Sequence, residues 1–200
     1  MARIEMSPEG RLLCLCARTR LNTEQEEEIR GIIGDSINWE ELFALGSRNR
    51  MLPFLYRNLK NIQDLDIPDE VSDSLRNSYK RNASRNLFRL TAVIRIVKEF
   101  EETQIPVIVF KGPVSSSLLY KDLGLRVFTD IDMIVQADRF IDTNDVLNDI
   151  GLSSEYTLTN RQISALRKYR NELSFSSIDG SIHVDLHWKL LVEHLRILPT

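Results

Sequence analysis

The chain has 200 residues, of which 42% are hydrophobic and 28% charged, with a formal net charge of −3. This composition is typical of an ordinary globular protein and excludes a low-complexity chain or a disulfide framework. The only cysteines, Cys14 and Cys16, lie in the short apolar run "LLCLCA". They are predicted to be reduced core residues of a cytoplasmic protein. The run is too short for a signal peptide, and no apolar stretch approaches the roughly 18 residues of a membrane span, so we expect no membrane partner.

The first hundred residues show the apolar spacing of helices. Helices are predicted over residues 9–18, 23–33, 38–47, 51–60 and 69–102. Asn38, with Glu41 three residues later, is a helix-capping pattern, and Pro68 followed by Asp69 is typical of the start of a helix. We therefore expect residues 1–102 to form a helical subdomain whose last, long helix packs on the rest of the chain.

Charge is distributed unevenly along that long helix. Residues 75–98 contain seven basic side chains and no acidic one, so subtracting them from −3 leaves about −10 for the remainder. One apolar stripe is predicted at helical spacing: Leu75, Tyr79, Ala83, Leu87, Leu90, Val93, Ile94, Val97 and Phe100. Four arginines fall on the opposite side of the helical wheel: Arg81, Arg85, Arg89 and Arg95.

Two interpretations of this arginine face stay open. It is either a solvated surface or a contact for a polyanion, such as a triphosphate or a nucleic acid. No aromatic stacking pattern interleaves the arginines, so nucleic acid is the weaker version of the second interpretation.

After Gln104 the pattern changes to alternating strands and helices. The segment "IPVIVF" (105–110) is a compact β-branched run and predicts a buried strand. The elements expected after it are a helix over 112–122, the strand "DIDMIV" (130–135), a helix over 137–151 and a hairpin over 171–188 that turns at Asp179-Gly180. The predicted fold is therefore α+β, with a core over residues 103–200 made of a mixed sheet and flanking helices.

A phosphate site is predicted where the first strand turns into a helix. Lys111 and Gly112 stand at this turn. A helix N-terminus presents unpaired N–H groups and the positive end of the helix dipole, and both suit phosphate. Glycine lets a ligand approach the backbone, and lysine adds a point charge.

Carboxylates gather in the following strands. Asp130 and Asp132 are one residue apart, so on a strand both side chains point to the same face. Asp185, in "IHVDLHW", adds a third carboxylate if its strand is a neighbour. Three carboxylates on one face require a shared proton or a divalent cation such as Mg²⁺. With the phosphate site nearby, the pattern indicates phosphoryl or nucleotidyl transfer, the alternative being solvent-facing aspartates at a strand end.

Two stretches taken together resemble a known family. They are "FKGPVSSSLLYKDLGLRVFTDIDMIV" (110–135) and "HVDLHW" (183–188). Both are similar to the uncharacterised nucleotidyltransferase family of the DNA polymerase β-like superfamily. The resemblance is closest in the first stretch and looser in the helical half, where "RNRMLPFLYRNL" (48–59) also looks similar.

The resemblance implies a minimal nucleotidyltransferase core with N-terminal helices. It implies an enzyme that uses Mg²⁺ or Mn²⁺ to move an NMP group from an NTP, such as ATP, to an acceptor by a two-metal mechanism. Asp130, Asp132 and Asp185 are the implied catalytic metal ligands, and Lys111 and Gly112 are the implied triphosphate contacts. The acceptor, whether protein, RNA or small molecule, is not specified by these motifs.

The chain departs from the family pattern in two respects. Pro113 stands where the wider superfamily has a second glycine or a serine, and proline supplies no N–H to a phosphate. Lys111, or the hydroxyls of Ser115 and Ser116, are candidates to compensate for this lost N–H. Family members usually run well beyond the third carboxylate strand, whereas this sequence ends at Thr200, so we expect a truncated core whose substrate-binding region is absent or supplied elsewhere.

Three further residues have two interpretations each. Arg126, four residues before Asp130, either holds the aspartates in a bidentate ion pair or contacts phosphate. His183 and His187 share a strand face with Asp185, and we expect them to orient that carboxylate. Two imidazoles and a carboxylate are also plausible zinc ligands, which makes a metal-dependent hydrolase one alternative function. A catalytically inactive nucleotide-binding or scaffold module of the same fold is the other.

Overall fold

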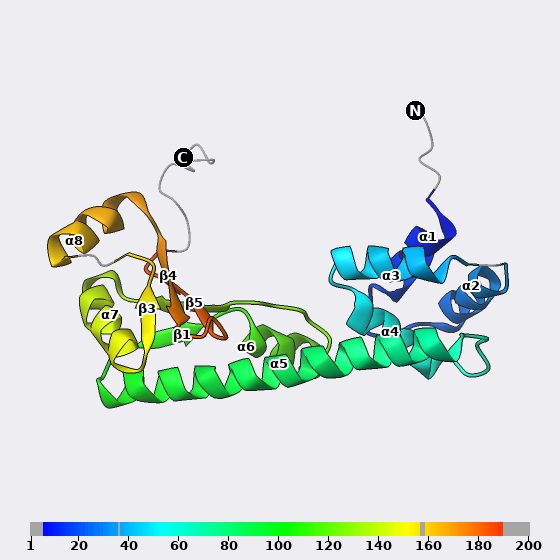
Figure 1. The fold of residues 1–200 in the computed structure, drawn as a ribbon, viewed down its shortest axis with the longest axis horizontal. Helices are drawn as coiled ribbons and strands as arrows, with labels where there is room; N and C mark the ends of the chain where they lie inside the picture. Colours follow the sequence, from blue (N-terminus) through cyan, green and yellow to red (C-terminus); the bar gives the residue numbers. More distant parts are fainter. Residues whose placement is uncertain (1–5, 36, 157–158, 190–200) are drawn as a thin grey trace. The chain divides into compact units, whose positions relative to one another are not determined.

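The computed structural model describes residues 6–35, 37–156 and 159–189. The chain forms two compact units (Figure 1). The first unit contains the residues up to Asn86 together with Tyr120–Val127, and the second contains Leu87–Leu119 and the chain from Phe128 onward.

The boundary between these units lies inside one helix, α5 (Asp69–Glu102), and not between residues 102 and 103 where the sequence suggested it. The reason is that α5 contributes to two separate hydrophobic cores, with Leu75 in the first and Phe100 in the second.

In the described residues before α5, the first unit contains four helices. They are α1 (Pro8–Cys16), α2 (Thr23–Gly34), α3 (Trp39–Arg48) and α4 (Leu52–Asn61). The predicted capping pattern is confirmed at α3, where the Asn38 side chain accepts a hydrogen bond from the Glu41 N–H at 3.1 Å. Buried side chains from these helices, including Leu12, Ile29 and Leu55, form the first core.

The two cysteines of α1 lie in different environments. Cys16 is fully buried in the first core, and this burial raises the pKa of its thiol to about 12. Cys14 is exposed, so the prediction that both cysteines are core residues is wrong for Cys14. Residues two apart on a helix face different sides, and the core covers only one of them.

The long helix predicted over residues 69–102 is confirmed, but its buried face differs from the predicted stripe. Leu87 and Ile94 are 56% and 60% exposed, whereas Asn82 and Asn86 are buried. The arginine side is also less uniform than expected, because the guanidinium of the half-buried Arg89 lies 5.8 Å from the centre of the Phe128 ring.

The buried asparagines of α5 hold the segment Tyr120–Val127. The Asn82 amide donates to the carbonyls of Gly124 and Arg126 at 2.8 and 3.1 Å, and Asn86 also donates to the carbonyl of Arg126, at 2.8 Å. These bonds satisfy backbone acceptors that would otherwise be buried without a partner. They explain why polar residues replace apolar ones in the middle of the predicted stripe.

In the part of the second unit that the structure describes, five strands form a mixed sheet in the order β1-β2-β5-β4-β3. The strands are β1 (Val107–Val109), β2 (Ile131–Val135), β3 (Leu152–Ser154), β4 (Glu172–Ser177) and β5 (His183–His187). β2 and β5 are parallel, and the other neighbouring pairs are antiparallel. The architecture is α+β, as predicted, and the expected hairpin of β4 and β5 is confirmed.

The prediction of a buried first strand is wrong. Among the described strands, β1 lies at the edge of the sheet beside β2, and Ile108 is 66% exposed. A β-branched run indicates a strand but does not show which of its faces is covered.

The helices of the second unit are shorter than predicted. The helix expected over 112–122 consists of α6 (Pro113–Ser115) continued by a π-helical turn, Ser116–Tyr120. The helix expected over 137–151 consists of a 3₁₀ turn, Ala137–Arg139, and α7 (Phe140–Asp149). The sequence did not predict β3 or α8 (Asn160–Tyr169).

The sheet has one apolar face and one polar face. Met133, Leu186 and Phe175 are fully buried on the apolar face, in a core that includes Ile96 of α5 and Phe140 of α7. On the other face the strands carry Asp132, Ile134, Asp185, His187, Ser174 and Glu172, and we call this the polar face. In the described part of the chain, no helix combines the length and apolar composition needed to cross a bilayer.

Candidate active site

Two of the predicted carboxylates are neighbours on the polar face. Asp132 of β2 and Asp185 of β5 are paired in the parallel register of these central strands. Residues paired in this way direct their side chains to the same face of the sheet. The sequence left open whether the Asp185 strand lies beside the Asp132 strand, and the sheet order answers that question.

Asp132 is the buried carboxylate of this pair, with only 5% of its surface exposed. Its Oδ1 atom lies 3.0 Å from the Lys111 ammonium and 3.4 Å from Nε2 of His187. A buried carboxylate requires such partners, because removing the charge from water is costly. The Lys111 side chain is about half exposed, so a ligand can reach the cation.

Gly112 brings the predicted phosphate turn against the start of β2. Its φ of +64° lies in the region that favours glycine, and a Cβ atom there would be 3.1 Å from the carbonyl oxygen of Asp130. The turn is further fixed by the Phe110 N–H, which donates to the carbonyl of Asp132 at 3.2 Å. The Lys-Gly turn and the Asp-x-Asp strand therefore meet, with the half-buried Asp130 directly before β2.

Asp185 and the histidines have partners that differ from those expected. The Ser174 hydroxyl donates to Oδ1 of Asp185 at 2.6 Å. His183 lies 2.9 Å from the Ser176 hydroxyl, and His187 contacts Asp132. The prediction that both histidines orient Asp185 is therefore not what the structure shows, because the strand register directs each of them to a different partner.

The polar face also contains residues that the sequence reasoning missed. Nδ1 of His187 lies 3.0 Å from Oε2 of Glu172, and the Phe110 ring packs edge-on against the imidazole at 5.1 Å. Glu172 and Ser174 pair with His187 and Asp185 in the hairpin register. The sequence held the information needed to find them. In a hairpin that turns at Asp179-Gly180, residues equally far from the turn are paired, and this places Glu172 opposite His187 and Ser174 opposite Asp185.

Three other residues were predicted to contact the triphosphate: Ser115, Ser116 and Arg126. The structure does not place them as it places the Lys-Gly turn, against the start of β2. Ser116 is fully buried, because it starts the π-helical turn, so its hydroxyl is inaccessible to a ligand in this structure. Ser115 is half-buried at the end of α6. Arg126 belongs to the first unit, where its carbonyl accepts from Asn82 and Asn86. A phosphate contact for Ser115 or Arg126 stays a prediction.

The donor set suits a hard cation better than zinc. Among the described residues, no three His, Cys, Asp or Glu side chains are grouped so that they could hold a metal ion as they stand. The register of β2 and β5 pairs the carboxylates of Asp132 and Asp185, and carboxylate oxygens are the donors that Mg²⁺ and Mn²⁺ prefer, so a site for such a cation here stays a prediction. His183 and His187 contact separate partners, so the zinc interpretation, and the hydrolase built on it, has no support in this geometry.

Comparison with known proteins gives one result that covers most of the chain. The model of a family described as "Uncharacterised nucleotidyltransferase" matches residues 35–199. This range includes α3, α4, α5 and all five strands of the sheet. A search of the curated proteins finds no match.

Proposed function

The chain belongs to the uncharacterised nucleotidyltransferase family, and from this premise we propose that it transfers an NMP group from an NTP to a hydroxyl or phosphate acceptor. We place the reaction on the polar face, beside Asp132 and Asp185. The observation that carries this proposal is the register pair of these two carboxylates on parallel strands, with Lys111 3.0 Å from the buried Asp132.

The proposed metal ligands are Asp130, Asp132 and Asp185. A divalent cation, Mg²⁺ or Mn²⁺, would supply Lewis-acid stabilisation of the charge on the triphosphate and the leaving pyrophosphate. Carboxylate oxygens are the ligands that these cations prefer. The chain's own contribution is to hold the buried Asp132 carboxylate at the base of the site, where burial weakens the competition from water.

Lys111 and Gly112 would bind the triphosphate. Lys111 is half exposed and lies beside Asp132. Its ammonium can therefore donate a hydrogen bond to a phosphate oxygen when a divalent cation replaces it as the partner of the Asp132 carboxylate. Gly112 is buried and has no side chain, which lets the turn lie against the carbonyl of Asp130, and we assign its backbone N–H to the phosphate as part of this proposal. His187, held between Asp132 and Glu172, would keep the Asp132 carboxylate in position.

The test uses the full chain with each of the four α-³²P-labelled NTPs, in MgCl₂ or MnCl₂, and measures both bound nucleotide and transferred label. We expect nucleotide binding that needs the cation, and transfer to the chain itself or to added RNA or small-molecule acceptors. Asp132→Asn should reduce transfer about a hundredfold or more, because it removes a carboxylate from the centre of the site.

Asp138→Asn is the matched control, since it removes an exposed carboxylate from the same unit outside the site. It should leave binding and transfer unchanged. The proposal fails if the unaltered chain neither binds nor transfers nucleotide, or if Asp132→Asn behaves like Asp138→Asn.

A second candidate function is nucleotide binding without transfer. Two observations favour it: Pro113 removes one N–H from the phosphate turn, and the Asp132 carboxylate is already paired with Lys111. Stoichiometric binding of an NTP with no transferred label under any metal would support this candidate over the enzyme.

A further inference from the structure

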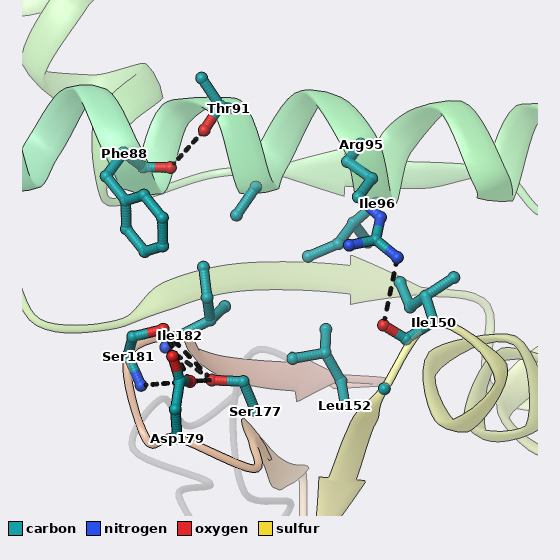
Figure 2. A pocket seen from close by; sticks show the side chains of 12 residues that line it. Phe88, Thr91, Arg95, Ile96, Ile150, Leu152, Ser177, Asp179, Ser181 and Ile182 are labelled. Atoms are coloured by element: carbon teal, nitrogen blue, oxygen red, sulfur yellow. Dashed lines mark hydrogen bonds between the residues drawn. The ribbon is translucent and has the colours of Figure 1, made fainter.

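A cavity of about 380 Å³ lies in the second unit, between α5 and the turns that flank β3, β4 and β5 (Figure 2). Its walls are largely apolar and include Phe88 and Ile96 of α5 together with Ile150, Leu152 and Ile182. None of the carboxylates of the proposed active site lines it. The cavity is of the size that small ligands or parts of larger ones occupy.

Phe88 is the aromatic group of this cavity. It is 52% exposed and projects from α5 toward the strands, so one side of the ring is available to a ligand (Figure 2). In the sequence, Phe88 stands three residues after Arg85 and seven before Arg95. An exposed aromatic side chain therefore does interrupt the arginine run of this helix, which the apolar pattern alone did not indicate.

Two opposite charges lie at separate ends of the cavity (Figure 2). Arg95 donates to the carbonyl of Ile150 at 3.4 Å, a long contact that leaves its charge unneutralised, and no salt bridge in the described part of the chain includes it. Asp179 accepts at Oδ1 from Ser177 and Ser181, and these bonds lower its pKa to about 2. The carboxylate is thus ionised and oriented, with Oδ2 available to a donor.

We propose that this cavity is a binding site for single-stranded nucleic acid, in which an unpaired base stacks on Phe88 and the adjoining phosphate pairs with Arg95. The Oδ2 atom of Asp179 accepts from an exocyclic amino group of the base. Stacking on an aromatic ring beside a cation is how proteins commonly hold unpaired nucleotides.

The charge of the helix favours a polyanion over a small neutral ligand. The part of α5 that belongs to the second unit, residues 87–98, carries three basic side chains and no acidic one, in a chain whose formal net charge is −3. Arg95 and Lys98 are exposed on this part of the helix. The proposal goes beyond nucleotide transfer and does not depend on it.

The first experiment measures the binding of a fluorescein-labelled, mixed-sequence 12-residue RNA to the full chain by fluorescence anisotropy. Phe88→Ala should weaken binding about tenfold, the effect expected from the loss of one stacked base. Leu87→Ala is the matched control, because Leu87 is 56% exposed on the same helix but does not line the cavity. It should change the dissociation constant less than twofold.

A second pair of variants separates a specific phosphate contact from general attraction. Arg95→Gln should weaken RNA binding several-fold and reduce the slope of log Kd against log salt by about one. Lys98→Gln removes the same charge from an exposed position outside the cavity and should have a smaller effect. The proposal would be overturned if Arg95→Gln and Lys98→Gln lost equal RNA-binding affinity, or if Phe88→Ala lost none.

Further ligands identify the source of the base and phosphate. A DNA 12-mer of the same sequence should bind, whereas the RNA annealed to its complement should bind at least several-fold more weakly, because its bases are not free to stack. Equal binding of the duplex, or displacement of the RNA by inorganic polyphosphate alone, would overturn the proposal in favour of charge attraction. Displacement of the RNA by CMP or GMP at equal concentration would instead assign the cavity to a free nucleotide. It would overturn the proposal that the ligand is a single-stranded nucleic acid.

One more measurement keeps the two proposals apart. Asp132→Asn should bind the RNA as the unaltered chain does, since Asp132 does not line the cavity. Loss of transfer with retained RNA binding would leave this site standing, and loss of RNA binding in Phe88→Ala would leave NTP binding and transfer to acceptors other than RNA untouched.

Discussion

Asp132 and Lys111 form the central charge pair of the candidate site. The Asp132 side chain is 7% exposed and the Lys111 side chain 51%. Lys111 can therefore move away from the pair, and Asp132 is then left as a buried carboxylate without this charged partner. This asymmetry is what a site needs if a cation and a phosphate are to replace one internal ion pair.

At this scale we predict the effect of removing the lysine. Lys111→Met should lower the free energy of unfolding by about 1–2 kcal/mol, because the Asp132 carboxylate loses a charged partner. In an Asp132→Asn background the same change should cost less, with a coupling of about 1 kcal/mol in a double-mutant cycle measured by urea unfolding.

Lys98→Met is the control for this cycle, since its ion pair with Glu102 joins two exposed side chains. It should change stability by only a few tenths of a kcal/mol. A coupling near zero between Lys111 and Asp132 would contradict the role given to the pair.

At the scale of elements, the turn between β1 and α6 depends on a glycine. Gly112 and Gly180 have similar φ angles, +64° and +67°, but only at Gly112 would an added Cβ atom meet a neighbour within 4 Å. The two positions therefore separate the cost of backbone conformation from the cost of close approach.

We predict that Gly180→Ala lowers the free energy of unfolding by about 1 kcal/mol, the cost of a left-handed alanine. Gly112→Ala should cost at least about 1 kcal/mol more, because its Cβ would press on the carbonyl of Asp130. It should also weaken NTP binding, which Gly180→Ala should not. Equal stability losses, measured by urea unfolding, would show that the turn moves away from β2 without penalty.

Elements whose signals are local were predicted well. The capped helix α3, the long α5, β2 and the hairpin of β4 and β5 all lie where periodicity and turn residues place them. β1 was expected to be buried and is an edge strand. Whether a strand is buried depends on which later strands and helices pack against it, and its own sequence does not specify this. The buried Asn86 was missed for the same reason, since its partners are carbonyls about 40 residues away.

At the scale of the whole molecule, two weak acids tie stability to alkaline pH: the half-buried Tyr79 and the fully buried Cys16. Burial raises the pKa of Tyr79 to about 12, helped by its hydrogen bond to Asp122, and burial raises the pKa of Cys16 to about 12. Their ordinary values are about 10 and about 8.5. Between these values and about pH 12, the folded chain holds protons that the unfolded chain has lost.

The free energy of unfolding should therefore be constant below about pH 8 as far as these groups are concerned, and should fall as the pH rises toward 12. The Tyr79→Phe variant has no ionisable group at this position, so its free energy of unfolding should fall less steeply above pH 10 than that of the unaltered chain. Tyr169→Phe, at a side chain that is 82% exposed, should keep the slope of the unaltered chain. Urea unfolding at pH 8, 9, 10 and 11 gives the comparison, and identical slopes for all three chains would refute the assignment.

The amino-acid sequence by itself determined the α+β class and the order of most elements, because helix caps, apolar periods and strand-turn patterns act over a few residues, and its motifs indicated the family that the family model then matched. Only the tertiary structure decided that Asp185 pairs with Asp132, that His187 contacts a carboxylate 55 residues away, and that Phe88 faces a cavity. These facts follow from strand order, register and the packing of α5 on the sheet. They join segments far apart in the chain, and no local pattern specifies which distant partners will meet.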